Sequence, residues 1–99
     1  MKALGVINAD GTARAIAGAV AGQKQAVGVY GFTLSHLMPK ERRLVHASLT
    51  WNGGVSNGLV VQYCPAYSTD GSIVFLVSTK GDPGVKMDAA FSFSAEMIP

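Results

Sequence analysis

The stretch from residue 85 to residue 97, VKMDAAFSFSAEM, alternates apolar side chains with polar or small ones over its whole length. A period of two residues is that of a β-strand with one buried face. At 3.3 Å per residue this strand would span about 43 Å, well beyond the usual five or six residues. We therefore expect a long closing strand, part of which enters a neighbouring subunit or curves round a barrel. Its inward row would be Val85, Met87, Ala89, Phe91, Phe93, Ala95 and Met97.

Other segments share this period and are separated by turn-forming Gly, Asn, Asp and Pro. Residues 72–80 are nearly all apolar at their centre and predict a central strand, and NGGVSNG at 52–58 predicts a hairpin loop. We predict an all-β fold, a single antiparallel β-sandwich or jelly-roll-like barrel over residues 27–99. The predicted inward rows of two further strands are Tyr30, Phe32 and Leu34, and Val45, Ala47, Leu49 and Trp51.

The first 26 residues have no aromatic side chain and are rich in Ala and Gly. ALGVI and TARAI predict short strands around the turn NADG. The next run, AIAGAVAGQKQA, has two interior glycines, each of which costs a helix about 1 kcal/mol relative to Ala. We predict an N-terminal arm over residues 1–26, extended or irregular and lying against other chains, with a short helix as the alternative. Arm and sandwich would form one domain.

Charged residues make up only 14% of the chain, against about 25% in an average domain. Residues 44–69 contain no Asp, Glu, Lys or Arg at all. We therefore expect part of the uncharged surface to be buried against another chain. The net charge of +2 is too small to indicate a polyanion partner. Candidate contacts with other copies or with a capsid protein are Ala17, Val20, Arg42, Arg43, Ser92 and Ser94.

No targeting or membrane segment is predicted. Asn8 and Asp10 interrupt any apolar run near the start, and no stretch approaches 18 apolar residues. Cys64 is the single cysteine, which excludes an internal disulfide. It lies between a predicted strand and a proline, and we expect a buried, inert thiol.

Catalytic patterns are missing from the sequence. His36 and His46 match no metal-ligand spacing and are expected to be structural or surface residues. Asp70 and Asp82 occupy turn positions rather than those of a glycosidase pair. The chain has no G-x-S-x-G, P-loop or G-x-G-x-x-G motif. We predict that the protein is not an enzyme and needs no metal or cofactor.

Two groups of residues are candidates for recognition. Trp51, Tyr63 and Tyr67 have Asn and Gln nearby and could stack on sugar rings, with core or subunit packing as the alternative. The basic run PKERRLVH contains Arg42 and Arg43 and is expected to pair with acidic groups of a neighbour. Nucleic acid is the less favoured partner for this run, because few aromatics are interleaved with it.

The series of short strands, closed by FSFS after GDPGVKMDA, resembles the compact β-sandwich modules of bacteriophage virions over residues 27–99. These are head-decoration proteins, head fibres and tail-fibre tips, several of which form trimers. The closing strand is also similar to the jelly roll of tumour-necrosis-factor-like trimers. The resemblance implies a structural virion protein, a homotrimer that decorates a capsid or belongs to a fibre, present in host cytoplasm during assembly. The alternative is a module that binds carbohydrate or a receptor.

Overall fold

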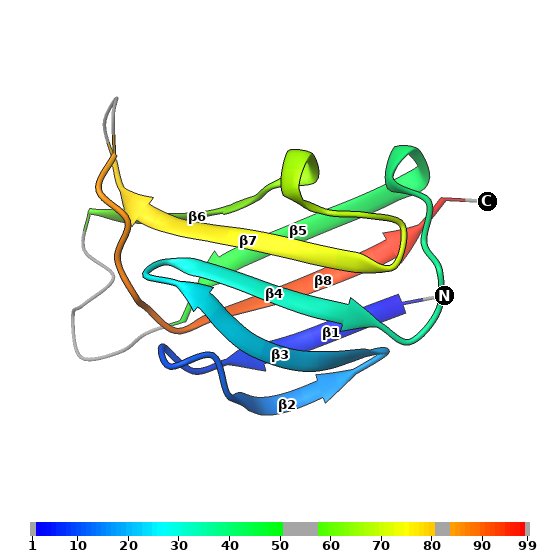
Figure 1. Cartoon of the computed structure of the whole chain (residues 1–99), viewed down its shortest axis with the longest axis horizontal. Helices are drawn as coiled ribbons and strands as arrows, with labels where there is room; N and C mark the ends of the chain where they lie inside the picture. The colour runs from blue at the N-terminus through cyan, green and yellow to red at the C-terminus, as the bar shows by residue number, and fades with distance from the viewer. Residues whose placement is uncertain (1, 51–57, 81–83, 99) are drawn as a thin grey trace.

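The computed structural model describes residues 2–50, 58–80 and 84–98, without the side chains of residues 21–23. Two antiparallel four-stranded sheets pack face to face (Figure 1). Sheet A has the order β2-β1-β8-β5 and sheet B the order β3-β4-β7-β6. The predicted all-β sandwich is thus confirmed. The elements are β1 (Lys2–Ile7), β2 (Ala13–Ala17), β3 (Ala19–Ala26), β4 (Val29–Leu34), η1 (Lys40–Arg42), β5 (Arg43–Leu49), β6 (Leu59–Tyr63), η2 (Pro65–Tyr67), β7 (Ser72–Thr79) and β8 (Phe91–Met97).

The core between the sheets is built around five aromatic rings. They come from β4, β7 and β8, whose inward rows alternate with outward residues as the pleat of a strand requires. Tyr30 meets Phe91 edge-on at a centroid distance of 5.1 Å, and Phe75 lies 4.9 Å from Phe93. The buried row predicted for β4, which includes Phe32, is confirmed, as is the central position of β7 between β4 and β6.

The closing strand is shorter than its alternation predicts. The inward positions from residue 89 to residue 95 are buried, as expected, but Val85 and Met87 are 65% and 41% exposed. The Asp88 carboxylate accepts a hydrogen bond from the Gly28 amide, which binds this segment to the β3–β4 turn. The strand in sheet A begins at Phe91 and fits within the sandwich. The segment before it pairs instead with the end of β7 in sheet B through an isolated bridge between Ser78 and Lys86.

The described residues 2–26 lie in the two sheets and form neither an arm nor a helix. The short strands predicted around the turn NADG are present as β1 and β2. β1 lies between β2 and β8 inside sheet A, and β3 forms an edge of sheet B. The chain passes from β2 to β3 through Gly18, whose φ of 76° and close approach to the Lys2 carbonyl oxygen require glycine. Small residues serve packing here, because Gly5 leaves room for the Phe93 ring on the paired strand.

The predicted hairpin loop at 52–58 lies outside the described residues, except for Gly58. The strands before and after it, β5 and β6, belong to different sheets. The two strands therefore do not form the hydrogen-bonded pair that a hairpin requires.

Candidate functional site

The solvent side of sheet A is covered by short, mostly neutral side chains. The register of the four strands places Ala17, Leu4, Ser94 and His46 in one row across this side. The next row is Ala15, Val6, Ser92 and Ser48. A third row holds Lys2, Glu96 and Leu44. We call these three rows together the sheet A outer face.

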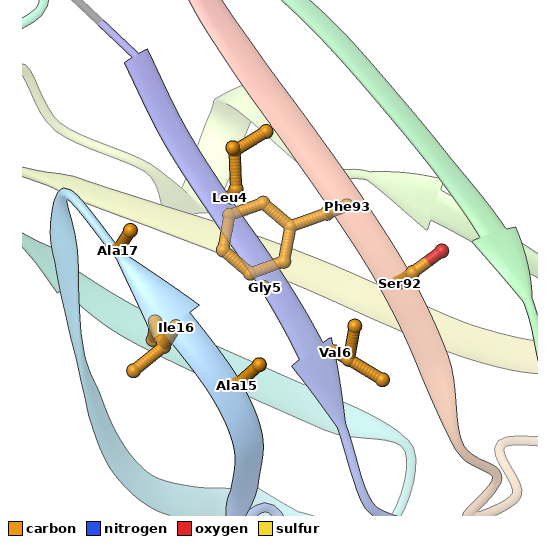
Figure 2. A pocket seen from close by; sticks show the side chains of 8 residues that line it. All are labelled: Leu4, Gly5, Val6, Ala15, Ile16, Ala17, Ser92 and Phe93. Carbon is orange, nitrogen blue, oxygen red and sulfur yellow. The ribbon is translucent and has the colours of Figure 1, made fainter.

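Two shallow grooves cross the sheet A outer face on either side of Ser92. One has a volume of about 390 Å³ and runs between β1 and β2, where Leu4 lies across from Ala17 and Val6 across from Ala15 (Figure 2). The other has a volume of about 360 Å³ and is lined by β5 and β8 side chains, including His46. Alanine and serine are too short to fill the space between rows, so a partner's side chains could enter these grooves.

Of the three rows, only the third holds charged side chains. Lys2 Nζ lies 3.2 Å from a Glu96 carboxylate oxygen, and both side chains are more than half exposed. Such a pair adds at most about 1 kcal/mol to stability. The ion pair matters for binding, because the two charges neutralise each other and this part of the surface presents no net charge to a partner.

The six predicted contact residues do not form one patch. Ala17, Ser92 and Ser94 share the sheet A outer face. Val20, which is 61% exposed, lies instead on β3 of sheet B. Arg42 is exposed, and its Nε donates to the Ile98 carbonyl oxygen at 3.1 Å.

Arg43 is engaged within the chain, a role that the basic run in the sequence did not reveal. Its Nη1 donates to the Tyr63 hydroxyl at 3.0 Å and to the Ser72 carbonyl oxygen at 3.1 Å. Its Nη2 donates to the carbonyl oxygens of Met38 at 2.6 Å and Thr69 at 2.8 Å. The guanidinium thus joins the edge of sheet A to the β6–β7 hairpin of sheet B.

The three aromatic candidates are also separated. Trp51 lies outside the described residues. Tyr63 packs toward the core, with its ring centroid 6.1 Å from that of Phe75. Tyr67 is 73% exposed on η2 and borders a groove on the solvent side of sheet B. Sequence reasoning missed the other residues of that groove, such as Gln25 and Thr33, because they come from strands remote in sequence.

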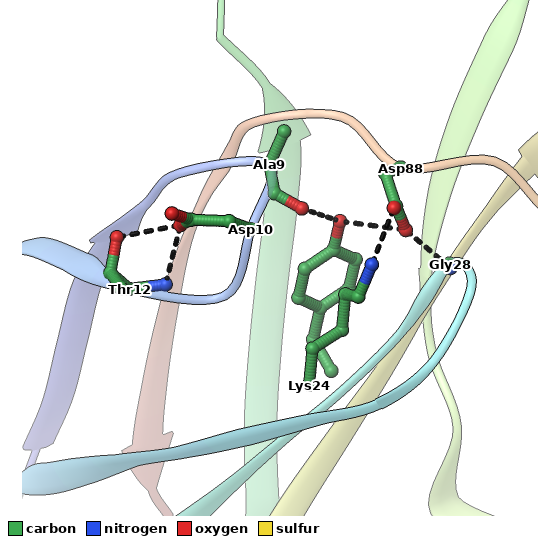
Figure 3. A network of polar contacts seen from close by, with 7 residues as sticks. Ala9, Asp10, Thr12, Lys24, Gly28 and Asp88 are labelled. Atoms are coloured by element: carbon green, nitrogen blue, oxygen red, sulfur yellow. Dashed lines mark hydrogen bonds and ion pairs between the residues drawn. The ribbon is translucent and has the colours of Figure 1, made fainter.

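A polar network holds one end of the sandwich (Figure 3). The Asp88 carboxylate pairs with the Lys24 ammonium and accepts from the Gly28 amide at 2.8 Å. The Tyr30 hydroxyl donates to the Ala9 carbonyl oxygen at 2.6 Å. The lysine hydrogen bond lowers the pKa of Asp88, whereas burial, with the Asp88 charge nearby, raises the pKa of Tyr30 to about 12. Both shifts favour the states in which the network is intact, which indicates a structural role.

The remaining candidate groups for chemistry are scattered. Cys64 is half-buried, and burial raises the pKa of its thiol. His36 and His46 are both exposed. Across residues 2–50, 58–80 and 84–98, no three His, Cys, Asp or Glu side chains are placed to hold a metal ion. In the same residues, no helix has the length and apolarity to cross a membrane.

In comparisons with known proteins, no family model matches the chain, and no match is found among curated proteins or solved structures. The likeness of residues 27–99 to virion modules therefore stays a prediction. The function has to be inferred from the surfaces described above.

Proposed function

We propose that this protein is a non-catalytic structural protein that assembles with copies of itself through the sheet A outer face. The observation that carries the proposal is the character of this face. A sheet exposed to water on one side normally alternates buried apolar residues with well-hydrated ones. Apart from His46 and the Lys2–Glu96 pair, the outward rows hold only Ala, Ser, Leu and Val, with Leu4 46% and Leu44 47% exposed.

A second copy of the chain is the partner that suits this face. Each charge of the Lys2–Glu96 pair at its end can pair with a charged group on a neighbouring copy. The net charge of +2 is small, so copies repel each other only weakly. An acidic or basic macromolecule would find no opposing field on the outward rows described above.

The size of the face favours a ring over a simple pair. Four strands about 4.8 Å apart and seven residues long cover roughly 440 Å². That is about half of the 800 Å² per partner that a standard stable interface buries. In a closed ring each copy uses two different surfaces, so the buried area per copy roughly doubles. We therefore expect a closed ring in which the sheet A outer face packs against another surface of the next copy. We propose three copies because several of the virion modules that the chain resembles form trimers.

The virion setting is a further step in the proposal, supported by the resemblance of residues 27–99 to virion modules. In that setting a major capsid protein or another virion protein is the second partner. The neighbouring genes test this step, because virion genes lie together. Flanking genes for head or tail proteins would support it, and flanking genes of unrelated metabolism would contradict it.

Solution mass, measured by light scattering after size exclusion, tests the assembly itself. We expect about three times the chain mass of 10.3 kDa. A dimer would mean that the face packs on itself and would overturn the ring. A monomer at every concentration would overturn self-assembly altogether.

Charge substitutions test which surface is used. Ser94→Arg, at the centre of the sheet A outer face, and Ala17→Arg, on its edge strand, should give monomers, because each would bury an unpaired charge in the contact. Gln62→Arg is the comparison variant on the exposed side of sheet B. An unchanged mass would show that this side is not the second surface of the ring, and loss of the trimer would show that it is. Circular dichroism checks that each variant keeps the fold. Folded arginine variants with the wild-type mass would contradict this use of sheet A.

A further inference from the structure

A polar groove lies on the solvent side of sheet B, remote from the sheet A outer face. Its volume is about 190 Å³. It is bordered by residues of β3, β4 and β7 and by the exposed ring on η2. The groove residues used below are Gln25, Gly31, Thr33, Tyr67, Ser72 and Val74. We propose that this groove binds a neutral sugar ring and that Tyr67 is its stacking platform.

The floor of the groove lies at Gly31, where the chain has no side chain. Gly31 and Val74 are paired across β4 and β7, and Val74 is only 4% exposed. With no side chain at residue 31, the Gln25 amide lies directly over the β4 backbone, and a Cβ at residue 31 would overlap it. The glycine therefore creates the hollow and brings an amide group to its floor.

The Tyr67 ring is exposed while its backbone is held firmly. Tyr67 N donates to the Cys64 carbonyl oxygen at 3.2 Å. The next residue, Ser68, is buried, and its hydroxyl donates to the same Cys64 oxygen at 2.8 Å while accepting from Val74 N at 3.0 Å. The 3₁₀ turn is thereby attached to β7. An aromatic ring that is 73% exposed on an anchored turn is preorganised to receive a flat apolar face.

The chemistry around the ring fits a carbohydrate. One face of a pyranose presents C–H groups, which pack on an aromatic ring, while its hydroxyls need donors and acceptors at the side. Gln25 offers both through its amide, and Thr33 offers a hydroxyl. The Ser72 hydroxyl is already within 3.0 Å of the Thr69 hydroxyl and accepts from the Thr69 amide, so it mainly shapes the wall.

Charge and size narrow the class of sugar. None of the described lining residues is Asp, Glu, Lys, Arg or His, so the groove offers no partner to a carboxylate or a phosphate. Its volume is below the roughly 300 to 1,000 Å³ of sites for drug-sized ligands. It accommodates one neutral ring, with the rest of a glycan extending into solvent. Because sheet B faces away from sheet A, the groove can stay open when the sheet A outer face is covered.

Saturation-transfer NMR with the methyl glycosides of glucose, galactose, mannose and N-acetylglucosamine tests the proposal. We expect transfer to at least one of them, and Tyr67→Ala should weaken its binding about tenfold, since an aromatic contact contributes up to about 1.5 kcal/mol. Tyr67→Phe keeps the ring and should bind within about twofold of wild type. Val85→Ala is the matched control, because Val85 is 65% exposed but lies outside the groove.

A second variant tests the floor independently of the ring. Gly31→Ala should displace the Gln25 amide and weaken binding, while the fold is kept because the overlapping atom belongs to a flexible side chain. Ser94→Arg, which removes self-assembly if the proposed function holds, should bind sugar like wild type. Transfer to none of the four glycosides, or equal affinity of Tyr67→Ala and wild type, would overturn the site. Neither result depends on whether the chain forms oligomers.

Discussion

Replacing Arg43 by methionine tests the role of the guanidinium that joins the two sheets. Methionine keeps most of the apolar stem but removes all four hydrogen bonds, to Tyr63, Ser72, Met38 and Thr69. No acidic side chain takes part in these bonds. The stabilisation comes from guanidinium N–H groups that donate hydrogen bonds to one tyrosine hydroxyl and three backbone carbonyl oxygens. We expect Arg43→Met to lower the free energy of unfolding substantially.

The magnitude follows from how many of these bonds are shielded from water. Three of the four are partly buried, and the bond to Thr69 is exposed. At a net contribution of about 1 kcal/mol each, the shielded bonds give a loss of about 3 kcal/mol. Arg43 Nε is buried without a hydrogen-bond partner, and its removal recovers part of the lost free energy. The positive charge of the guanidinium acts the other way, because it makes each of the lost hydrogen bonds stronger. For a domain of this size, 3 kcal/mol corresponds to roughly 12 to 24 °C in Tm.

Urea unfolding followed by circular dichroism gives the measurement, with Arg42→Met as the matched control. Arg42 precedes Arg43 in sequence and makes one exposed hydrogen bond, so its loss should cost less than about 1 kcal/mol. Both variants are made in the Ser94→Arg background, so that assembly does not contribute to the apparent stability. Equal urea midpoints for the two methionine variants would refute the argument. Arg43 would then contribute no more to stability than the exposed Arg42 does.

Three further results are expected from urea titrations. Because burial raises the pKa of Tyr30 from 10.0 to about 12, the free energy of unfolding should fall between pH 10 and pH 12, and Tyr30→Phe should remove that slope. The pKa of Asp88 is lowered by its lysine partner, so wild type should lose stability as the pH falls below 3.8; an unchanged acid slope in Asp88→Asn would contradict this. Gly5→Ala would put a Cβ 2.5 Å from Phe93 Cε1 and should cost about 1–3 kcal/mol, more than Gly71→Ala, whose nearest contact is 3.6 Å.

The alternation of the last segment predicts its core residues well and its length poorly. Phe91 and Phe93 are buried, as the alternation predicts. This part could be predicted because a repeat of two residues is a local pattern that can be read directly from the sequence. Val85 and Met87 continue the same pattern, yet they are exposed. They pair instead with the end of β7 in sheet B, where Thr79 N donates to the Val85 carbonyl oxygen at 2.8 Å and Met87 N to the Val77 carbonyl oxygen at 3.1 Å. No local pattern reports which sheet a segment joins.

Residues 1–26 illustrate a second limit of prediction from sequence. The small residues among them suggest an arm when they are considered alone, since they bury little surface. In the folded chain their size is complementary to remote partners: Gly5 fits under Phe93, and Gly18 fits against the Lys2 carbonyl. The space available to a residue is set by what packs on it, so composition alone could not distinguish an arm from a sheet.

The sequence suggested individual candidate residues for recognition, but it did not show which of them lie together in one site. The exposed ring of Tyr67 could be anticipated from its polar, proline-containing surroundings. Tyr63, four residues earlier, could not be told apart from it, although it points to the core. The amide of Gln25 joins the site through β3, and the hollow exists because β4 places Gly31 beside it.

The pairing of β1 with β8 also constrains how the protein is made. Sheet A needs β8 between β1 and β5, whereas all strands of sheet B have been synthesised by Thr79. During translation β1 and β5 must therefore wait, with unpaired edges, until the central strand emerges from the ribosome. Contacts this distant in sequence slow folding and prolong the time in which open edges can join other chains. Nascent chains of this protein on one messenger RNA are thus exposed to mispairing until β8 has emerged.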